Sequence, residues 1–524
     1  MTAKEQKELG DLLFPNTKQT IADLLKEYPL RELPPGAEVL RFAPSPTGYL
    51  HLGSFYSAFI QFLAARRTHG VFYLRLEDTD QKREIQGAGD ILYKSLIDYG
   101  VVPDEGYRGD KLTEQGKYGP YVQSKRIELY NVFAKHLIEN GNAFPCFCAK
   151  TENKSEIIKR REQEIANNDE IREKDVCRDL SFDELKTKIA QGLPFAIRLK
   201  SKGDGTKTRE VTDIFKGKRE VRENAKDIIL LKSNGIPPYA FAHLVDDTLM
   251  RTTKVIRGED WYSSLAAHIE LFEAAGFQPL QYGHTPVIST VDSATGNKRK
   301  LSKRYDPQAD MRFYEQAGYP KQAVLEYILT IANSDFESWR SKNPGTHIYE
   351  FPFSLAKVGN SNPMFDWNKL NDISKNIIAK MTCKQINKEV TGYFTGTGKM
   401  SAEDFTKMYA ILAIDRETPK PRKDIVKYSD IPELYSYIFR EPVKSLPLIS
   451  PKAVHEYAKA YQHSDSKEQW FARIKNECEK NGYSVKDYTR DIRVALTGRE
   501  NTPDLYVIMQ ILGNTEVLKR LQKT

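Results

Sequence analysis

The chain has 524 residues and carries 79 Lys plus Arg against 71 Asp plus Glu, a formal net charge of +8. This length predicts three or four domains, and the mild positive charge permits nucleic-acid binding without requiring it. Five cysteines in so long a chain exclude a disulfide framework and favour a reducing compartment. No stretch approaches the roughly 18 apolar residues of a membrane span, and the N-terminus does not resemble a signal or transit peptide, so we expect a cytoplasmic protein.

The first part of the chain predicts an accessory segment and then a strand, a turn and a helix. Residues 1–36 indicate a helix and a linker ending in two prolines and a glycine, which we interpret as a structural cap on the domain that follows. In RFAPSPTGYLHLG (41–53), the prolines and Gly48 interrupt a strand, and a helical pattern begins at Ser54. Such a turn exposes backbone N–H groups at the positive end of a helix, which suits a phosphate. His51 could donate to that phosphate or simply cap the helix, and the triplet His51-Leu52-Gly53 alone favours the cap.

Further along the chain, apolar and charged segments alternate before the pattern becomes helical. Strands are predicted over 70–78, 195–205, 227–233, 242–247 and 254–260, and helices over 89–100, 155–175 and from 324 onward, with an almost wholly helical region from 361. We find no internal repeat at the periods of solenoid proteins.

A basic loop, RKLSKR, occupies residues 299–304. Lys300, Lys303 and Arg304 surround Ser302, and lysines on a mobile loop could hold a triphosphate and follow its charge into the transition state. In isolation, a solvated basic loop is the better interpretation of the string.

Taken together, these motifs resemble those of a known enzyme family. PSPTGYLHLG followed by KLSKR is similar to the motif pair of class I aminoacyl-tRNA synthetases. The intervening and later motifs resemble bacterial-type glutamyl-tRNA synthetases; they are LRLEDTD (74–80), PPYAFAHLVDD (237–247), VIRGEDW (255–261), NPMFDWNKL (362–370) and RVALTGRENTPDLYVIMQILG (493–513). The resemblance therefore covers most of the chain.

The resemblance implies an α/β fold: a Rossmann-type nucleotide-binding domain with an inserted acceptor-binding domain, followed by an all-α anticodon-binding region. It implies ATP and Mg²⁺ as cofactors, L-glutamate and tRNA(Glu) as partners, no membrane, and a monomer. The predicted domains are 1–36 (accessory extension), 37–120 and 226–290 (the two Rossmann halves), 121–225 (acceptor-end insertion), 291–360 (KLSKR loop and connecting domain) and 361–524 (helical anticodon-binding domain).

The same resemblance assigns roles to individual positions. His51, Lys300 and Lys303 match the catalytic residues. ATP binding is implied for Ser45, His51, Gly53, Trp261, Lys300, Ser302 and Lys303. Glutamate binding is implied for Arg41, Ala43, Ser45, Glu77, Tyr239, His243 and Arg257. Two positions depart from the family pattern: the last histidine of the ATP motif is here Ser54, and the pocket residue that is usually Asn is here His243.

Arg257 decides between glutamate and glutamine as substrate. A guanidinium pairs bidentately with a carboxylate and cannot lose its proton, whereas opposite a neutral amide it would lack its partner. Glutaminyl-tRNA synthetases resemble this pattern but lack an arginine here and usually read PEPNG or PEPSG. The alternative interpretation of Arg257 is a structural salt bridge with Glu259 or Asp260.

A candidate metal site lies in the insertion. Cys146, Cys148, Cys177 and Asp179 follow a spacing that is similar to the structural zinc site of some relatives. Because Asp stands where His is expected, we favour reduced structural cysteines over zinc. We interpret Cys383 and Cys478 as packing residues.

The helical C-terminal region is expected to read the tRNA anticodon. It offers aromatic side chains for stacking and cations for phosphates, at Tyr409, Tyr428, Arg416, Lys420, Arg422, Lys423 and Lys427. Alternatives that remain are a glutaminyl-tRNA synthetase, a small-molecule nucleotidyltransferase and a non-catalytic tRNA-binding paralogue. The sequence leaves open whether tRNA(Gln) is also charged.

Overall fold

The computed structural model describes residues 1–80, 85–109, 113–148, 176–292, 294–395, 400–442 and 446–523. These form two compact units, one of residues 1–312 and 328–365 and the other of residues 313–327 and 366–524. The charged helix predicted over 155–175 lies outside the described residues.

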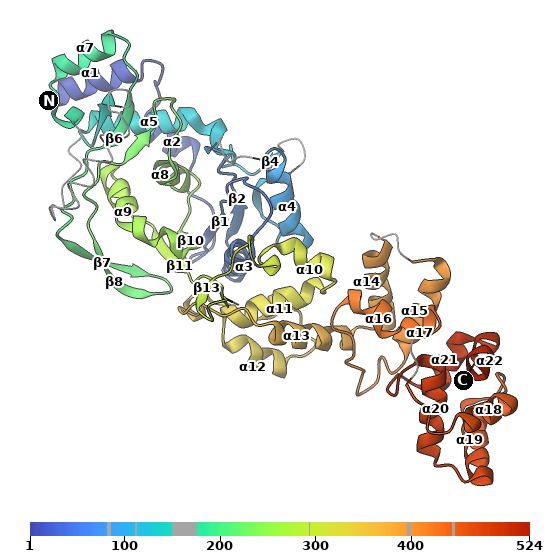
Figure 1. The fold of residues 1–524 in the computed structure, drawn as a ribbon. Helices are drawn as coiled ribbons and strands as arrows, with labels where there is room; N and C mark the ends of the chain where they lie inside the picture. The colour runs from blue at the N-terminus through green and yellow to red at the C-terminus, as the bar shows by residue number, and fades with distance from the viewer. Residues whose placement is uncertain are drawn as a thin grey trace. The chain divides into compact units, whose positions relative to one another are not determined.

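The first unit holds every strand of the described chain and a set of helices around them (Figure 1). Its strands are β1 (Val39–Phe42), β2 (Val71–Leu74), β3 (Glu105–Tyr107), β4 (Glu114–Gln115), β5 (Ala143–Cys146), β6 (Ala196–Leu199), β7 (Thr208–Asp213), β8 (Gly217–Arg222), β9 (Ile229–Leu231), β10 (Lys254–Gly258), β11 (Gln281–Thr285), β12 (Ser289–Val291) and β13 (Lys298–Lys300). Its helices are α1 (Ala3–Leu13), α2 (Ile21–Glu27), α3 (Leu52–Arg67), α4 (Ala88–Asp98), η1 (Gln123–Arg126), α5 (Ile127–Glu139), η3 (Val176–Asp179), α7 (Phe182–Ala190), α8 (Tyr239–Leu249), η4 (Glu259–Ser264), α9 (Leu265–Ala274), η5 (Pro307–Ala309), α12 (Asp335–Lys342), η6 (Ile348–Glu350) and η7 (Leu355–Lys357).

Parallel strands joined by helical crossovers form the nucleotide-binding part. β1 pairs in parallel with β2, and β2 with β3, while α3 and α4 provide the two crossovers. β10 and β11 make a second parallel pair, joined through η4 and α9. The two sets meet where β1 lies beside β10, since Thr253 N donates to Val39 O at 3.0 Å. The expected Rossmann-type α/β fold is therefore confirmed, and the carboxyl ends of β1 and β10 open toward one site.

A ribbon of β7 and β8 extends the second half of this sheet. The two strands pair antiparallel over their whole length, and the last residue of β7, Asp213, pairs in parallel with Tyr282 of β11. The ribbon falls within the predicted acceptor-end insertion (121–225), yet one of its ends is joined to the nucleotide-binding sheet. This placement brings Asp213 next to the elements that line the site described below.

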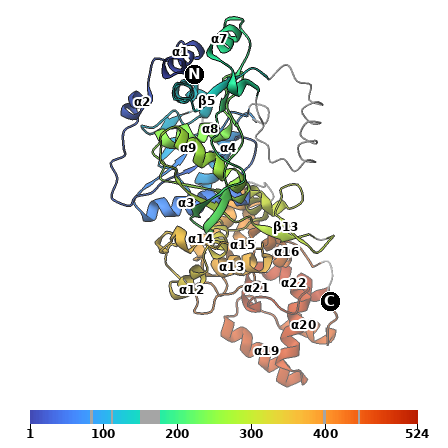
Figure 2. The ribbon, with the colours of Figure 1, turned by 90° about the vertical axis from the view of Figure 1, so that its left-hand side faces the viewer.

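The rest of the insertion contains α5, α7 and the strands β5 and β6, which form a three-stranded antiparallel sheet with β9. Because β9 pairs with β6, this sheet continues beyond the boundary predicted at residue 225. Both ribbon views place α1 beside α7 (Figures 1 and 2). Lys135 of α5 pairs with Asp11 at 2.7 Å and Lys186 of α7 with Glu8 at 3.1 Å. Helix α1 therefore covers the insertion, in contrast to the expected cap on the nucleotide domain, although Arg31 does reach that domain through Glu105 at 2.8 Å.

One predicted strand is wrong. Residues 242–247 belong to helix α8, which begins after Pro238 and is buried along nearly its whole length. A helix that is buried on all sides reads as a short apolar run, and periodicity alone cannot distinguish it from a buried strand. The helical geometry matters for function, because it sets Tyr239, His243 and Asp247 on one face at steps of four residues.

The second unit is helical, as expected for the region from 361, and it has two apolar cores. Two further helices, α10 (Met311–Ala317) and α11 (Lys321–Ala332), cross the boundaries between the units in sequence. The helices of the second unit are α13 (Trp367–Lys380), α14 (Cys383–Thr395), α15 (Ala402–Ala413), η8 (Tyr428–Asp430), α16 (Ile431–Leu434), α17 (Ser436–Phe439), α18 (Pro451–Ala460), α19 (Lys467–Asn481), α20 (Val485–Thr497), α21 (Leu505–Leu512) and α22 (Asn514–Gln522). None of the described helices is both long and apolar enough to span a bilayer.

Candidate active site

A cavity of about 530 Å³ opens at the carboxyl ends of β1 and β10. Its walls come from the turn after β1, the first turns of α3, the end of β2, the start of α8, the end of β10 with η4, and the basic loop after β13. The predicted site residues that line it are Arg41, Ala43, Ser45, His51, Gly53, Glu77, Tyr239, Arg257, Trp261, Lys300 and Lys303. Ser302 lines an adjoining hollow with His51, and His243 lines neither.

His51 both caps a helix and faces the cavity. Its Nδ1 accepts the backbone N–H of Gly53 at 2.9 Å, at the N-terminus of α3. This bond makes Nδ1 the acceptor, so the ring proton lies on Nε2. The ring also makes a hydrogen bond to the backbone of Leu301, which a ligand would have to replace. Burial lowers the pKa of His51, and the nearby Lys303 and Lys300 lower it further. The two interpretations left open by the sequence are thus compatible, because the cap fixes the tautomer that can donate.

The basic loop is anchored at its base and reaches the cavity with its lysines. Arg299 pairs with Asp306 at 2.6 and 2.8 Å, which closes the loop on itself. Lys300 contacts the carboxylate of Asp260, and Lys303 donates to the backbone carbonyl of Tyr49. Each lysine therefore contacts one acceptor at the rim of the cavity, and a bound phosphate could take the place of that acceptor.

A buried ionic network forms the floor beneath the cavity. Arg41 pairs with Asp247 at 3.3 Å and donates to Ile256 O at 3.2 Å, while Arg75 bridges Asp247 at 2.7 Å and Glu77 at 3.0 Å. Asp247 also contacts His243, which is fully buried. Arg75 and Asp247 were not predicted as site residues, because isolated acidic and basic residues are usually solvated.

Glu77 is the carboxylate of this network that reaches the cavity. It is 6 % exposed, and burial raises its pKa to about 7 although Arg75 opposes this. A carboxyl group in that range can be charged or neutral near physiological pH. A cation placed in the cavity would favour the charged form.

His243 lies behind Tyr239 and does not line the cavity. Its ring stacks on that of Tyr239 at 5.7 Å, Nδ1 contacts Asp247, and Nε2 lies 2.9 Å from the Tyr282 hydroxyl. Burial lowers the pKa of His243 to about 4, so the ring is neutral. This placement argues against the predicted glutamate contact and assigns His243 to the support of Asp247 and Tyr282.

Arg257 is a buried cation that faces the cavity, 6 % exposed. The alternative salt bridges do not form, because Glu259 pairs with Lys216 at 2.6 Å and Asp260 contacts Lys300. The guanidinium instead donates to three neutral acceptors, which are His284 Nε2 at 3.0 Å, His268 Nδ1 at 2.9 Å and Trp261 O at 3.4 Å. No described carboxylate neutralises it.

Several residues of this site were not predicted from the sequence. His268 and His284 touch Arg257, and Asp213 contacts His284 at 2.6 Å. A signal was present: the chain has only nine histidines, and three of them, at 243, 268 and 284, occur within one short apolar region. Gln61 of α3 also lines the cavity, and its Oε1 has no hydrogen-bond partner among the described residues.

Three of the four residues of the candidate metal site lie close together in the structure. The sulfurs of Cys146, Cys148 and Cys177 lie within 4.8 Å of one another. Asp179 does not join them, since its side chain is 85 % exposed and lies 3.9 Å from Lys200. Three converging thiols fit a soft divalent cation, whereas the predicted carboxylate ligand does not fit.

In the helical unit, two predicted tRNA contacts have structural partners. Tyr428 is 4 % exposed and belongs to an apolar core, so it has no ring face for a base. Arg416 donates to Ile378 O at 2.6 Å and Leu412 O at 2.8 Å. The exposed cations among the predicted set are Lys420 and Lys423.

Comparison with known proteins agrees with this arrangement. Residues 38–340 match the family described as class I tRNA synthetases (E and Q), catalytic domain, and residues 402–524 match an anticodon binding domain. The glutamate–tRNA ligase of Acetivibrio thermocellus is 40 % identical, covering 99 % of this chain and all of the relative; that of Sorangium cellulosum is 35 % identical, covering 95 % and 96 %. In fold, the chain is similar to the crystal structure of a glutamate tRNA ligase from Elizabethkingia meningosepticum in complex with its amino acid, with a TM-score of 0.74, 24 % identity and coverage of 93 % and 99 %.

Proposed function

The chain belongs to the glutamate–tRNA ligases of the class I synthetase family, and from this premise we propose that Arg257 selects L-glutamate by pairing with its side-chain carboxylate. The observation that carries the proposal is the uncompensated charge of this buried guanidinium. Three of its five N–H groups are used by His284, His268 and Trp261, which leaves one on each terminal nitrogen. A carboxylate would accept both and supply the missing charge.

The remaining cavity residues suit the two ends of the amino acid and its partner ATP. We assign the α-ammonium group to Glu77, whose carboxylate is the acidic group of the buried network that lines the cavity. Arg41, Ala43, Ser45 and Tyr239 line the wall between Glu77 and Arg257. The α-carboxylate would then face the turn and His51, where the triphosphate is expected.

In the first step, the α-carboxylate attacks the α-phosphate of ATP, which arrives as its Mg²⁺ complex, and glutamyl-adenylate and pyrophosphate form. We propose that the Nε2–H of His51 and the ammonium groups of Lys300 and Lys303 stabilise charge on the phosphates as the bond breaks. Trp261, Gly53 and Ser302 complete the ATP side. No nucleophile of the enzyme is needed, so catalysis rests on position and charge.

In the second step, the 3′-terminal ribose of tRNA takes the glutamyl group. We propose tRNA(Glu) as the acceptor and the helical unit as the reader of its anticodon, since residues 402–524 match an anticodon binding domain. A glutaminyl enzyme is disfavoured because a neutral amide would leave the charge of Arg257 unmatched.

We further propose a structural zinc ion held by Cys146, Cys148 and Cys177, which would tie β5 to η3 in the insertion. The proposal rests on the convergence of three thiols, and it assigns no fourth ligand. We also propose that the protein is a cytoplasmic monomer.

The decisive experiment replaces Arg257 by glutamine and measures glutamate-dependent ATP–pyrophosphate exchange with tRNA present. Leaving a carboxylate without its buried partner costs roughly 2–5 kcal/mol, so kcat/KM for glutamate should fall by about 30- to 5,000-fold. Arg66→Gln, which removes a surface pair with Asp104, is the matched control and should leave activity unchanged. Normal turnover of R257Q, with a wild-type melting profile, would refute the assignment.

A further inference from the structure

Two imidazole rings accept hydrogen bonds from Arg257. Because a guanidinium can only donate, these contacts fix which nitrogen of each ring carries the proton. His284 Nε2 and His268 Nδ1 must both be acceptors. The proton of His284 therefore lies on Nδ1 and that of His268 on Nε2. This second nitrogen of His268 is buried and has no hydrogen-bond partner among the described residues, which indicates that the ring is oriented for Arg257 rather than for its own hydrogen bonds.

Asp213 sets the tautomer of His284. Its Oδ2 accepts the Nδ1–H of His284 at 2.6 Å, and its Oδ1 accepts the backbone N–H groups of Phe215 at 2.9 Å and Lys216 at 3.0 Å. Both carboxylate oxygens thus face only donors. Burial raises the pKa of Asp213, but these hydrogen bonds outweigh it and keep the group ionised. The acceptor at Nδ1 is what holds the imidazole proton of His284 away from Arg257.

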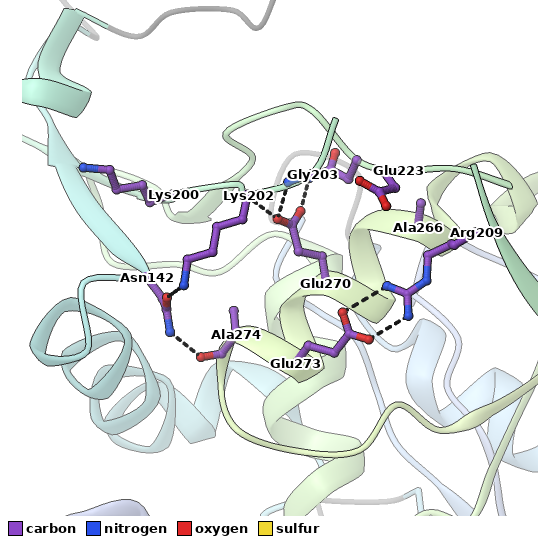
Figure 3. Close-up of a pocket in the computed structure, with 11 residues that line it drawn as sticks. Asn142, Lys200, Lys202, Gly203, Arg209, Glu223, Ala266, Glu270, Glu273 and Ala274 are labelled. Atoms are coloured by element: carbon purple, nitrogen blue, oxygen red, sulfur yellow. Dashed lines mark hydrogen bonds and ion pairs between the residues drawn. The ribbon is translucent and has the colours of Figure 1, made fainter. Parts of the chain in front are cut away.

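The elements that carry these residues are tied together on the far side of α9 (Figure 3). Arg209 of β7 makes a bidentate pair with Glu273 of α9 at 3.0 and 2.7 Å. Glu270, one turn earlier, accepts from Lys202 N at 2.7 Å and Asn224 Nδ2 at 2.6 Å. A cavity of about 360 Å³ lies here, but its three carboxylates all accept hydrogen bonds within the protein. We interpret the residues around this cavity as the contacts that hold the β7–β8 ribbon against α9.

From this arrangement we propose that Asp213 and His284 are positioning residues that determine the enzyme's preference for an acidic side chain, acting through Arg257. The inference rests on the proposed role of Arg257. An acid in direct contact would neutralise the guanidinium and compete with the substrate carboxylate. Placing the acid one imidazole away orients the guanidinium while leaving its charge and two N–H groups for the substrate.

The test is Asp213→Asn, which keeps the shape and changes one acceptor into a donor. Because Phe215 N and Lys216 N need the amide oxygen, the NH₂ group must face His284 Nδ1. The ring proton then moves to Nε2 and opposes the N–H of Arg257. We expect KM for glutamate to rise about 10- to 100-fold, the range for a second-layer partner, with kcat and KM for ATP changed little, and discrimination against glutamine to fall.

A second pair of variants keeps the test valid if D213N folds poorly. His284→Gln can present oxygen to Arg257 and NH₂ to Asp213, so it should keep KM for glutamate near that of wild type, whereas His284→Leu should raise it as D213N does. Asp104→Asn, a carboxylate that likewise binds a backbone N–H (Phe72 N, 2.9 Å) and an arginine, is the control. Equal KM values in H284Q and H284L, or a wild-type KM in D213N, would overturn the inference. Wild-type enzyme without glutamate activation would instead overturn the proposed function.

Discussion

The buried carboxyl of Glu77 predicts that glutamate binding depends on pH in a narrow window. Its pKa is raised by burial from 4.5 to about 7, which corresponds to a penalty of about 3 kcal/mol on the charged form at 1.36 kcal/mol per factor of ten. The proposed contact with the α-ammonium requires the charged form. Neither the α-ammonium nor the γ-carboxylate of glutamate titrates between pH 6 and 8, so this window reports on the enzyme.

The expected size follows from the charged fraction of Glu77. With a pKa of about 7, roughly a tenth of the molecules are charged at pH 6, half at pH 7 and nine tenths at pH 8. KM for glutamate should therefore fall about tenfold from pH 6 to pH 8. The assay is pyrophosphate exchange with tRNA present, with KM for ATP as internal control. Glu77→Gln should show a higher KM that no longer varies with pH.

Stability gives an independent check on the same group. Since the folded state binds the Glu77 proton more tightly than the unfolded state, this group lowers stability as pH rises from 4.5 to 7. Glu77→Gln removes that loss, so the variant should melt above wild type at pH 8, and the difference should vanish below pH 4.5. A wild-type KM that is constant from pH 6 to 8, together with identical melting of both proteins at pH 8, would refute the reasoning.

Two further predictions concern the loop and the cysteines. Lys303→Met should lower kcat of exchange about 100-fold and leave KM for glutamate unchanged, because Lys303 contacts the turn at Tyr49 and not the amino-acid side of the cavity; a change confined to KM for glutamate would contradict this role. Cys177→Ser should abolish bound zinc in elemental analysis of purified protein, whereas Asp179→Ala should retain it, because only the former belongs to the sulfur cluster. Wild-type protein without zinc would leave reduced structural cysteines as the correct interpretation.

The order of the functional motifs could be predicted from the sequence because each motif encodes its own local geometry. Pro44, Pro46 and Gly48 force a turn between β1 and α3 wherever they occur, and Gly48 indeed has a φ of 130° that suits glycine. The parallel fold follows from strands alternating with helices. Most of the ATP- and glutamate-binding residues assigned by resemblance line one cavity, and of that set only His243 and Ser302 lie outside its wall.

Long-range partners could not be predicted in the same way. The strand expected at 242–247 is a helix. Its surroundings bury nearly all of its faces, so its apolar residues show no helical period in the sequence. Tyr428 has the right chemistry for stacking but packs in a core. In each case the residue type permits two roles, and the tertiary environment selects one.

By itself, the sequence determined the fold class, the position of the nucleotide-binding turn and the identity of the arginine that we propose as the contact of the substrate carboxylate. Only the tertiary structure decided that this arginine has no carboxylate partner among the described residues and that His284 and His268 hold it, with Asp213 behind His284. The physical reason is that a charge is defined by its residue, whereas its compensation depends on atoms brought together by folding from strands and helices far apart in the chain.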